Sequence, residues 1–168
     1  MGISVENLEE ECCKSLKNYT ILVTDKNRKN KNIKFVDYVL DLDDKYLFIE
    51  EKSFILGILP PRNGEISDEV IEKFKALSLV EKELKICKTS FRLISDSNKK
   101  LKDTLLYLYK EFDDLEKIKK SPFIYLYCKS GLREVDRLLS TSLNMKNRKN
   151  TFLSCDRLEA FISKIKED

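Results

Sequence analysis

The sequence predicts an α/β fold: one domain with a central, mainly parallel sheet of about four to five strands and helices on both faces. Three observations support this fold class. Apolar runs of strand length end in turn residues, amphipathic stretches of helical period lie between them, and the C-terminal part alternates strand, helix, strand and helix. Strands that alternate with helices at this spacing are typical of a parallel sheet.

The composition is that of a globular domain in a reducing compartment. Of 168 residues, 42% are hydrophobic and 36% are charged, a balance that supports a packed core. No apolar window is long enough for a membrane span, and the acidic N-terminus lacks the apolar core of a signal peptide. Five cysteines without such a leader indicate free thiols. We therefore expect a cytoplasmic protein with no membrane partner.

Histidine is absent from the sequence, and the net charge is only +3. The absence of histidine excludes Cys-His and Ser-His catalysis and every His-ligated metal site, and we expect no metal and no cofactor. The excess of positive charge is too small to indicate binding of nucleic acid. The repeated "KNRKN", at 26–30 and 146–150, is expected to form lysine-rich surface loops. A nucleic-acid partner is therefore not expected.

The N-terminal half is predicted to contain one helix and several strands. Residues 4–17 form an amphipathic segment that Ser4 can cap. Residues 19–23 are the first strand candidate and residues 34–42 the second. Apolar stretches continue to Gly57 and stop at a pair of prolines.

From Ser67 onward the apolar period becomes helical. Two stripes, separated by the polar "SDSNKK", predict a long helical hairpin insertion over 67–119. We expect its two stripes to pack on each other and on the sheet, leaving a polar face free for a protein partner. The stripes consist of Val70, Phe74, Leu77, Leu84, Cys87, Phe91 and Ile94, and of Leu101, Leu105, Leu108, Phe112 and Leu115.

The C-terminal segment supplies the predicted parallel strands. "FIYLYC" (123–128) should be a central strand, because its apolar run needs cover on both sides. A helix over 132–143, a short strand over 151–154 and a last helix over 156–166 follow.

The loop after the central strand is the first candidate site. Cys128 ends the strand, and the next residues are Lys129, Ser130, Gly131, Leu132 and Arg133. A short strand-to-helix loop directs backbone N–H groups at one point, and the helix dipole and the two cations favour an anion there. Cys128 is therefore a candidate nucleophile, with the other residues as an anion-binding loop. The alternative is a structural thiol at the end of a strand.

Several motifs resemble the rhodanese-like sulfurtransferases. "CKSGLR" is similar to their Cys-x-x-Gly-x-Arg loop, and "ISVENLEE" is similar to their opening. Residues 38–61 resemble their first signature and residues 152–162 their closing motif. The resemblance implies a single rhodanese-like domain over 1–168 that carries sulfane sulfur as a persulfide on Cys128. Its partner would be a small sulfur donor or an acceptor protein.

Departures from the family pattern keep a second interpretation open. Asp43 and Phe54 stand where the family has Arg and His, and Glu134 stands where Ser is common. A member that has lost these residues can serve as a catalytically silent interaction module. The spacing from Cys128 to Arg133 is one residue shorter than in phosphatases of the same fold, which favours sulfur over phosphate chemistry.

A third interpretation places the chemistry elsewhere. "VDYVLDLDDKYLFIEEK" (36–52) resembles the core of PD-(D/E)XK nucleases, in which Asp37, Glu50 and Lys52 would hold Mg²⁺ and activate water. Glu50 and Lys52 would share one strand face, as that chemistry requires. We rank this interpretation below sulfur transfer, because Glu-x-Lys recurs at Glu83 and Lys85 and because "CKSGLR" would have no role.

Overall fold

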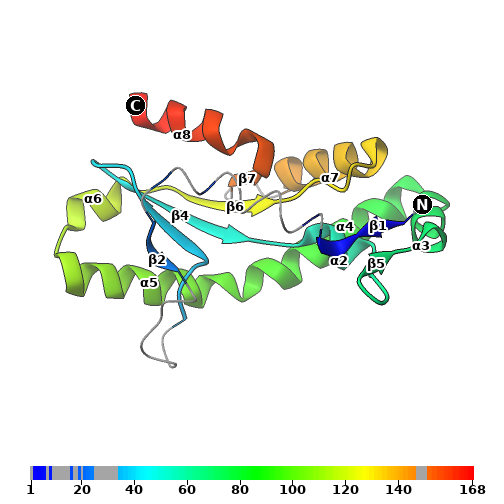
Figure 1. Cartoon of the computed structure of the whole chain (residues 1–168), viewed down its shortest axis with the longest axis horizontal. Coiled ribbons are helices and arrows are strands. Elements are labelled where there is room, and N and C mark those ends of the chain that lie inside the picture. The colour runs from blue at the N-terminus through cyan, green and yellow to red at the C-terminus, as the bar shows by residue number, and fades with distance from the viewer. Residues whose placement is uncertain are drawn as a thin grey trace.

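The computed structural model describes residues 2–6, 8, 16, 19, 21–24, 34–146 and 151–168. Within these residues the centre is a five-stranded sheet (Figure 1). Its strand order is β2 (Ile21–Thr24), β3 (Tyr38–Asp41), β4 (Tyr46–Glu51), β6 (Phe123–Tyr127) and β7 (Thr151–Ser154). A separate two-stranded sheet pairs β1 (Ile3–Ser4) with β5 (Glu65–Ile66).

The sheet confirms the α/β class, but it is mixed rather than mainly parallel. β2 pairs antiparallel with β3 and β3 with β4, whereas β4–β6 and β6–β7 are parallel. The link between β3 and β4 explains the difference. The N–H of Leu42 donates to the carbonyl of Lys45 at 2.9 Å, and Asp43 adopts a left-handed φ of 72°. So short a turn can join only antiparallel strands, because a parallel pair needs a crossover connection.

Strand β6 lies inside the sheet, between β4 and β7, as its apolar run predicted. On one face, Ile124 and Leu126 belong to a core cluster with Ile162 of α8 (Leu158–Glu167). On the other face, Tyr125 belongs to a cluster with Leu139 of α7 (Arg133–Lys146). Both faces of β6 are thus covered, which explains why its side chains are buried on both faces of the sheet.

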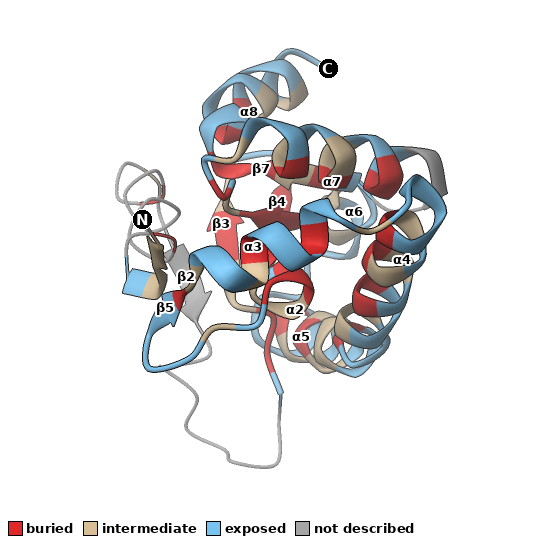
Figure 2. Ribbon diagram, turned by 90° about the vertical axis from the view of Figure 1, so that its right-hand side faces the viewer, coloured by how far each residue is buried: buried red, intermediate tan, exposed pale blue. Residues whose placement is uncertain are grey.

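Helix α5 (Ser97–Phe112) covers the other half of the sheet, on the side opposite α8 (Figure 1). Its buried Leu108 packs with Val39 of β3 and Phe48 of β4. Because side chains alternate along a strand, Glu50 lies on the same face as Phe48 and is turned toward α5. Figure 2 shows the buried residues concentrated on the strands and on the helix sides that face them.

The predicted hairpin over 67–119 is wrong in its geometry. The segment contains α3 (Asp68–Lys75), α4 (Leu79–Ser95), α5 and α6 (Leu115–Lys119). Asp96, which joins α4 to α5, has helical dihedrals, so α5 continues from α4 instead of folding back along it. Helix α4 packs against α7 and α2 (Phe54–Ile58), while α5 packs on the sheet.

Several members of the predicted stripes are consequently exposed. The exposed large apolar residues include Leu84 and Phe91 on α4, Phe112 at the end of α5 and Leu115 at the start of α6. The buried side of α4 instead carries Ile86, which the predicted stripe omitted. On α4 the packing partners are α7 and α2, so a different side of the helix is buried. On α5 the predicted Leu101, Leu105 and Leu108 do pack against the core cluster on the sheet.

Two predictions fall mainly outside the described residues. The N-terminal helix over 4–17 includes residues 7, 9–15 and 17, which lie outside them, although Ser4 belongs to β1. The same holds for the "KNRKN" segments, apart from residue 146 at the end of α7.

Within the described ranges, no helix is both long enough and apolar enough to cross a membrane.

Candidate functional site

Both candidate sites lie at the same edge of the sheet, where the parallel strands end. The N–H of Lys52, just after β4, donates to the carbonyl of Leu126 in β6 at 2.9 Å. Cys128 follows β6 directly. Because β3 runs antiparallel to β4, Asp37 at its start lies beside the end of β4. Ligand sites of open α/β sheets form at this carboxyl edge.

The structure brings Asp37, Glu50 and Lys52 together and adds Lys100 from α5; we refer to these four residues as the acid–lysine cluster. Oε1 of Glu50 accepts hydrogen bonds from Lys52 Nζ at 2.9 Å and from Lys100 Nζ at 2.7 Å. Lys100 Nζ also lies 3.4 Å from Asp37 Oδ1. The Glu50 side chain is 0% exposed, those of Lys52 and Lys100 are 12% and 23% exposed, and that of Asp37 is 26% exposed.

Backbone N–H groups hold the two carboxylates in place. The N–H of Asp37 donates to Glu50 Oε2 at 3.2 Å, and the N–H of Glu51 donates to Asp37 Oδ2 at 2.8 Å. Each carboxylate thus has one oxygen bound to the backbone of the neighbouring strand segment. The other oxygen of each, Glu50 Oε1 and Asp37 Oδ1, is turned toward Lys100.

The charges in the cluster perturb each other. Burial raises the pKa of Asp37, and the negative charge of Glu50 raises it further, while Lys100 opposes the rise. Burial alone would lower the pKa of Lys100, but the hydrogen bond to Glu50 and the charge of Asp37 hold it above its ordinary value. The formal charges of the two carboxylates and two ammonium groups sum to zero, and all four side chains are partly or fully buried.

The N-terminal part of α5 is fixed over this network by hydrogen bonds to the segment before β3. The N–H of Val36 donates to Thr104 Oγ1 at 3.0 Å, and the N–H of Lys34 donates to Asp103 Oδ2 at 3.2 Å. Thr104 is four residues after Lys100, so both lie on the same side of the helix. These contacts direct Lys100 toward Asp37.

Sequence reasoning did not identify Lys100. It is one of 32 basic residues and no local motif distinguishes it. Its partner Glu50 is 50 positions away in the chain. Only the packing of α5 on the sheet brings the two together.

The donor set of the cluster fits Mg²⁺ better than a softer metal. Among the described residues, no group of three or more His, Cys, Asp or Glu side chains is arranged to hold a metal ion. The cluster offers two carboxylates, each with one oxygen turned toward Lys100, and the Lys100 ammonium already lies between them. Mg²⁺ is commonly bound by one or two carboxylates, with waters and substrate phosphates as its other ligands.

The cysteine loop has the predicted backbone but its N–H groups are already bound. Gly131 adopts a φ of +82°, which permits the turn into α7. The N–H groups of Ser130 and Gly131 donate to the carboxylate of Asp136 at 2.7 and 3.0 Å, and the Ser130 hydroxyl donates to it at 2.7 Å. The N–H of Leu132 donates to Ser130 Oγ. The predicted anion cradle therefore holds a carboxylate of this chain.

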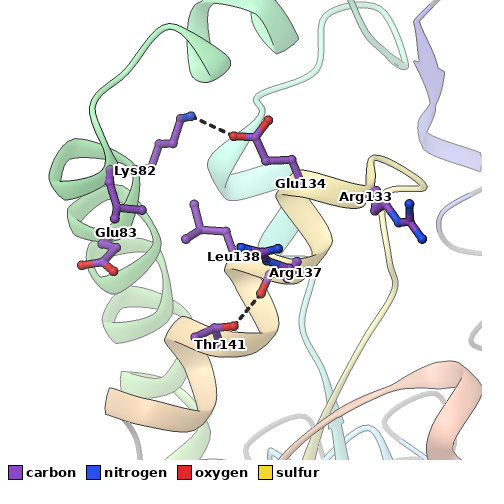
Figure 3. A pocket seen from close by; sticks show the side chains of 8 residues that line it. Lys82, Glu83, Arg133, Glu134, Arg137, Leu138 and Thr141 are labelled. Atoms are coloured by element: carbon purple, nitrogen blue, oxygen red, sulfur yellow. Dashed lines mark hydrogen bonds and ion pairs between the residues drawn. The ribbon is translucent and has the colours of Figure 1, made fainter.

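Cys128 and its predicted cationic neighbours have separate contacts. Its Sγ lies 3.5 Å from Sγ of Cys155, in the core cluster on the α8 side of the sheet. Lys129 forms an ion pair with Asp156 at 2.8 Å. Arg133 lines a pocket between α4 and α7, where Lys82 pairs with a carboxylate of α7 (Figure 3).

Comparisons with known proteins add no family to this picture. The chain matches no protein-family model. No curated protein and no solved structure is significantly similar to it. Its function must be inferred from the chemistry of the two sites.

Proposed function

We propose that the protein is a divalent-metal-dependent phosphodiesterase that cleaves nucleic acid, with Asp37, Glu50 and Lys52 as its catalytic residues. The observation that carries this proposal is the acid–lysine cluster, in which two carboxylates and a lysine meet within hydrogen-bond distance at the carboxyl edge of the sheet. The sequence alone ranked this interpretation below sulfur transfer. The proposal also replaces the expectation, drawn from net charge, that nucleic acid is not a partner.

The turn between β3 and β4 supports the proposal. A tight antiparallel hairpin places Asp37, before β3, beside Glu50, near the end of β4. Glu50 thus lies on β4 and Asp37 directly precedes β3, and backbone N–H groups fix the orientation of both carboxylates. Precise placement of this kind is what metal-assisted hydrolysis requires.

Each residue has a distinct role in the proposed reaction. Asp37 and Glu50 would hold Mg²⁺, and the bound ion would polarise a phosphoryl oxygen and make water more acidic. Lys52 contacts the same Glu50 oxygen at 2.9 Å, so its ammonium lies where it can orient the attacking water and neutralise charge on the phosphate. Water attacks phosphorus, one P–O ester bond breaks, and the leaving oxygen takes up a proton. The products are a phosphate monoester and a hydroxyl end.

A nuclease assay with matched controls tests the proposal. End-labelled single- and double-stranded DNA and RNA are incubated with the protein and Mg²⁺ or Mn²⁺, with and without EDTA. We expect metal-dependent cleavage, and a loss of about a hundredfold or more in Asp37→Asn, Glu50→Gln and Lys52→Ala. Glu83→Gln and Lys85→Ala are the controls, because they alter the same Glu-x-Lys pattern on α4.

Two results would contradict this function. One is the absence of cleavage of all four substrates with either metal. The other is cleavage that persists in Asp37→Asn and Glu50→Gln, which would indicate a contaminating nuclease. Lys52→Ala separates binding from chemistry, since it should retain the metal and lose the cleavage.

Sulfur transfer by a rhodanese-like domain is the second candidate. The glycine turn between a parallel strand and a helix N-terminus, directly after Cys128, favours it. The N–H groups of Ser130 and Gly131 already donate to the Asp136 carboxylate, which weighs against sulfur transfer. Thiosulfate-to-cyanide transfer, measured on the same preparation, tests this prediction. Activity that Cys128→Ser abolishes would support it, and its absence would leave the acid–lysine cluster as the candidate site.

A protein partner at residues 67–119 is a further proposal. Val80 and Phe91 on α4 are 73% and 79% exposed, which is unusual for side chains of this size. A second copy of the chain is the first partner to examine. Sedimentation equilibrium should show self-association that Phe91→Asp weakens, and a monomer at all concentrations would rule out this partner.

A further inference from the structure

We propose that Lys100 is a built-in occupant of the cation position between Asp37 and Glu50, which a divalent ion must displace, and that Lys100 thereby limits the affinity of the site for metal. The inference rests on the proposed function, because it takes these carboxylates as the metal ligands. It goes further by assigning a residue of α5 to the control of metal loading.

The geometry leaves one position for a cation shared by the two carboxylates. Glu50 Oε2 and Asp37 Oδ2 accept backbone N–H groups. The remaining oxygens both contact Lys100 Nζ, at 2.7 Å from Glu50 Oε1 and 3.4 Å from Asp37 Oδ1. A Mg²⁺ ion that ligates both oxygens at about 2.1 Å would lie in the space that this ammonium fills. The two cations cannot occupy it together.

The charges of the cluster also indicate that a divalent ion must displace a lysine. The acid–lysine cluster is neutral with its two lysines in place, and Glu50 is fully buried. A divalent ion added beside both lysines would leave two positive charges uncompensated among groups with little access to water. Outward movement of one lysine removes part of that excess. Metal binding is therefore incompatible with both lysines remaining in their inward positions.

Lys100, not Lys52, is the residue able to leave. Lys100 bridges the two carboxylates, lies near the N-terminal end of α5, and keeps 23% of its side chain exposed. Lys52 forms its ion pair with Glu50, follows the buried strand β4 and is 12% exposed. Displacement of Lys100 moves only a long side chain toward solvent, whereas Lys52 stays for the proposed chemistry.

Direct metal binding tests the inference without any nuclease assay. Mn²⁺ is titrated into tag-free protein and free Mn²⁺ is followed by electron paramagnetic resonance, for wild type, Asp37→Asn, Lys100→Gln and Lys102→Gln. We expect Lys100→Gln to bind Mn²⁺ on the order of tenfold more tightly than wild type, because a competing charge is gone. Lys102→Gln, at an exposed position of the same helix, should match wild type, and Asp37→Asn should bind more weakly.

A second measurement uses wild-type protein and so does not depend on whether Lys100→Gln folds. Lysines are acetylated briefly with and without saturating Mg²⁺, and the modified sites are quantified by mass spectrometry. Labelling of Lys100 should rise severalfold with Mg²⁺, because displacement exposes its ammonium, while labelling of the exposed Lys102 should not change.

The outcomes separate this inference from the proposed function. If neither wild type nor Lys100→Gln binds Mn²⁺, the metal site is wrong, and the inference fails with it. If wild type binds Mn²⁺ and Asp37→Asn weakens it, the site stands. Lys100→Gln affinity equal to or below that of wild type, or Lys100 labelling that Mg²⁺ leaves unchanged, then overturns the role of Lys100 alone.

Discussion

Substitution of Glu50 by Gln isolates the contribution of charge at the centre of the acid–lysine cluster. The carboxylate is fully buried and accepts from three donors: Lys52 Nζ at 2.9 Å, Lys100 Nζ at 2.7 Å and the N–H of Asp37 at 3.2 Å. The amide keeps the shape of the side chain. It offers one oxygen to three donors, and its NH₂ group must face one of them.

The expected loss of stability follows from these contacts. Hydrogen bonds to a charged partner contribute about 1.5–3 kcal/mol each, and removing one member of a buried ion pair costs about 3–5 kcal/mol. Residual exposure of Lys52 and Lys100 lets them recover some hydration, and relief of repulsion with Asp37 acts in the opposite direction. We therefore expect about 3 kcal/mol, the low end of that range. For a domain of this size, that corresponds to a fall in melting temperature of about 6–12 °C.

Urea denaturation followed by far-ultraviolet circular dichroism at pH 7 is a suitable assay, since the chain contains no Trp for fluorescence. Glu111→Gln, at an exposed position of α5, is the matched control and should denature at the wild-type midpoint. A loss below about 1 kcal/mol, or any gain, would refute the reasoning. It would mean that the two lysines do not depend on the Glu50 charge in the folded protein.

Three further predictions concern other parts of the molecule. Burial and the charge of Glu50 raise the pKa of Asp37, so the folded protein holds this proton to a higher pH than the unfolded chain does. Wild-type stability should therefore fall as pH rises from the unfolded value of about 3.9 through the raised folded value, and urea denaturation of Asp37→Asn should lack that decline. A Cβ at Gly57 would lie 2.4 Å from Cγ2 of Thr89, so Gly57→Ala should lose about 1–3 kcal/mol in the same assay. Adding Thr89→Ser removes that methyl group and should restore most of the loss; if it restores nothing, the clash is not the cause. Asp136→Ala should lower the free energy of unfolding by about 2–3 kcal/mol, because three donors of the cysteine loop lose a charged acceptor. An unchanged denaturation midpoint would show that the loop does not rely on this carboxylate.

Local pattern was sufficient for most of the individual elements. The apolar run at 123–128 and the helical period after it predicted β6 and α7 closely. The spacing of apolar residues along the chain indicates whether a segment is a buried strand or a helix with one buried side. Strand direction was not predicted correctly. The prediction of a mainly parallel sheet did not include the tight turn at Asp43, which joins β3 and β4 as an antiparallel pair.

The two candidate sites also show which features could be predicted from the sequence and which could not. Asp37, Glu50 and Lys52 could be selected from the sequence because one short hairpin carries all three. The cysteine loop was recognised by its glycine turn, yet its anion cradle proved to hold Asp136, a residue whose side-chain direction depends on where α7 begins.

The sequence by itself determined the α/β class, the central strand and the identity of three cluster residues, because each depends on neighbours a few positions away. Only the tertiary structure decided that α4 and α5 do not form a hairpin and that Lys100 reaches Glu50 from 50 residues away. Which face a helix buries depends on the surface it meets, and that surface is formed by distant parts of the chain. The Lys100 ammonium therefore reaches the centre of the site only because α5 packs on the sheet.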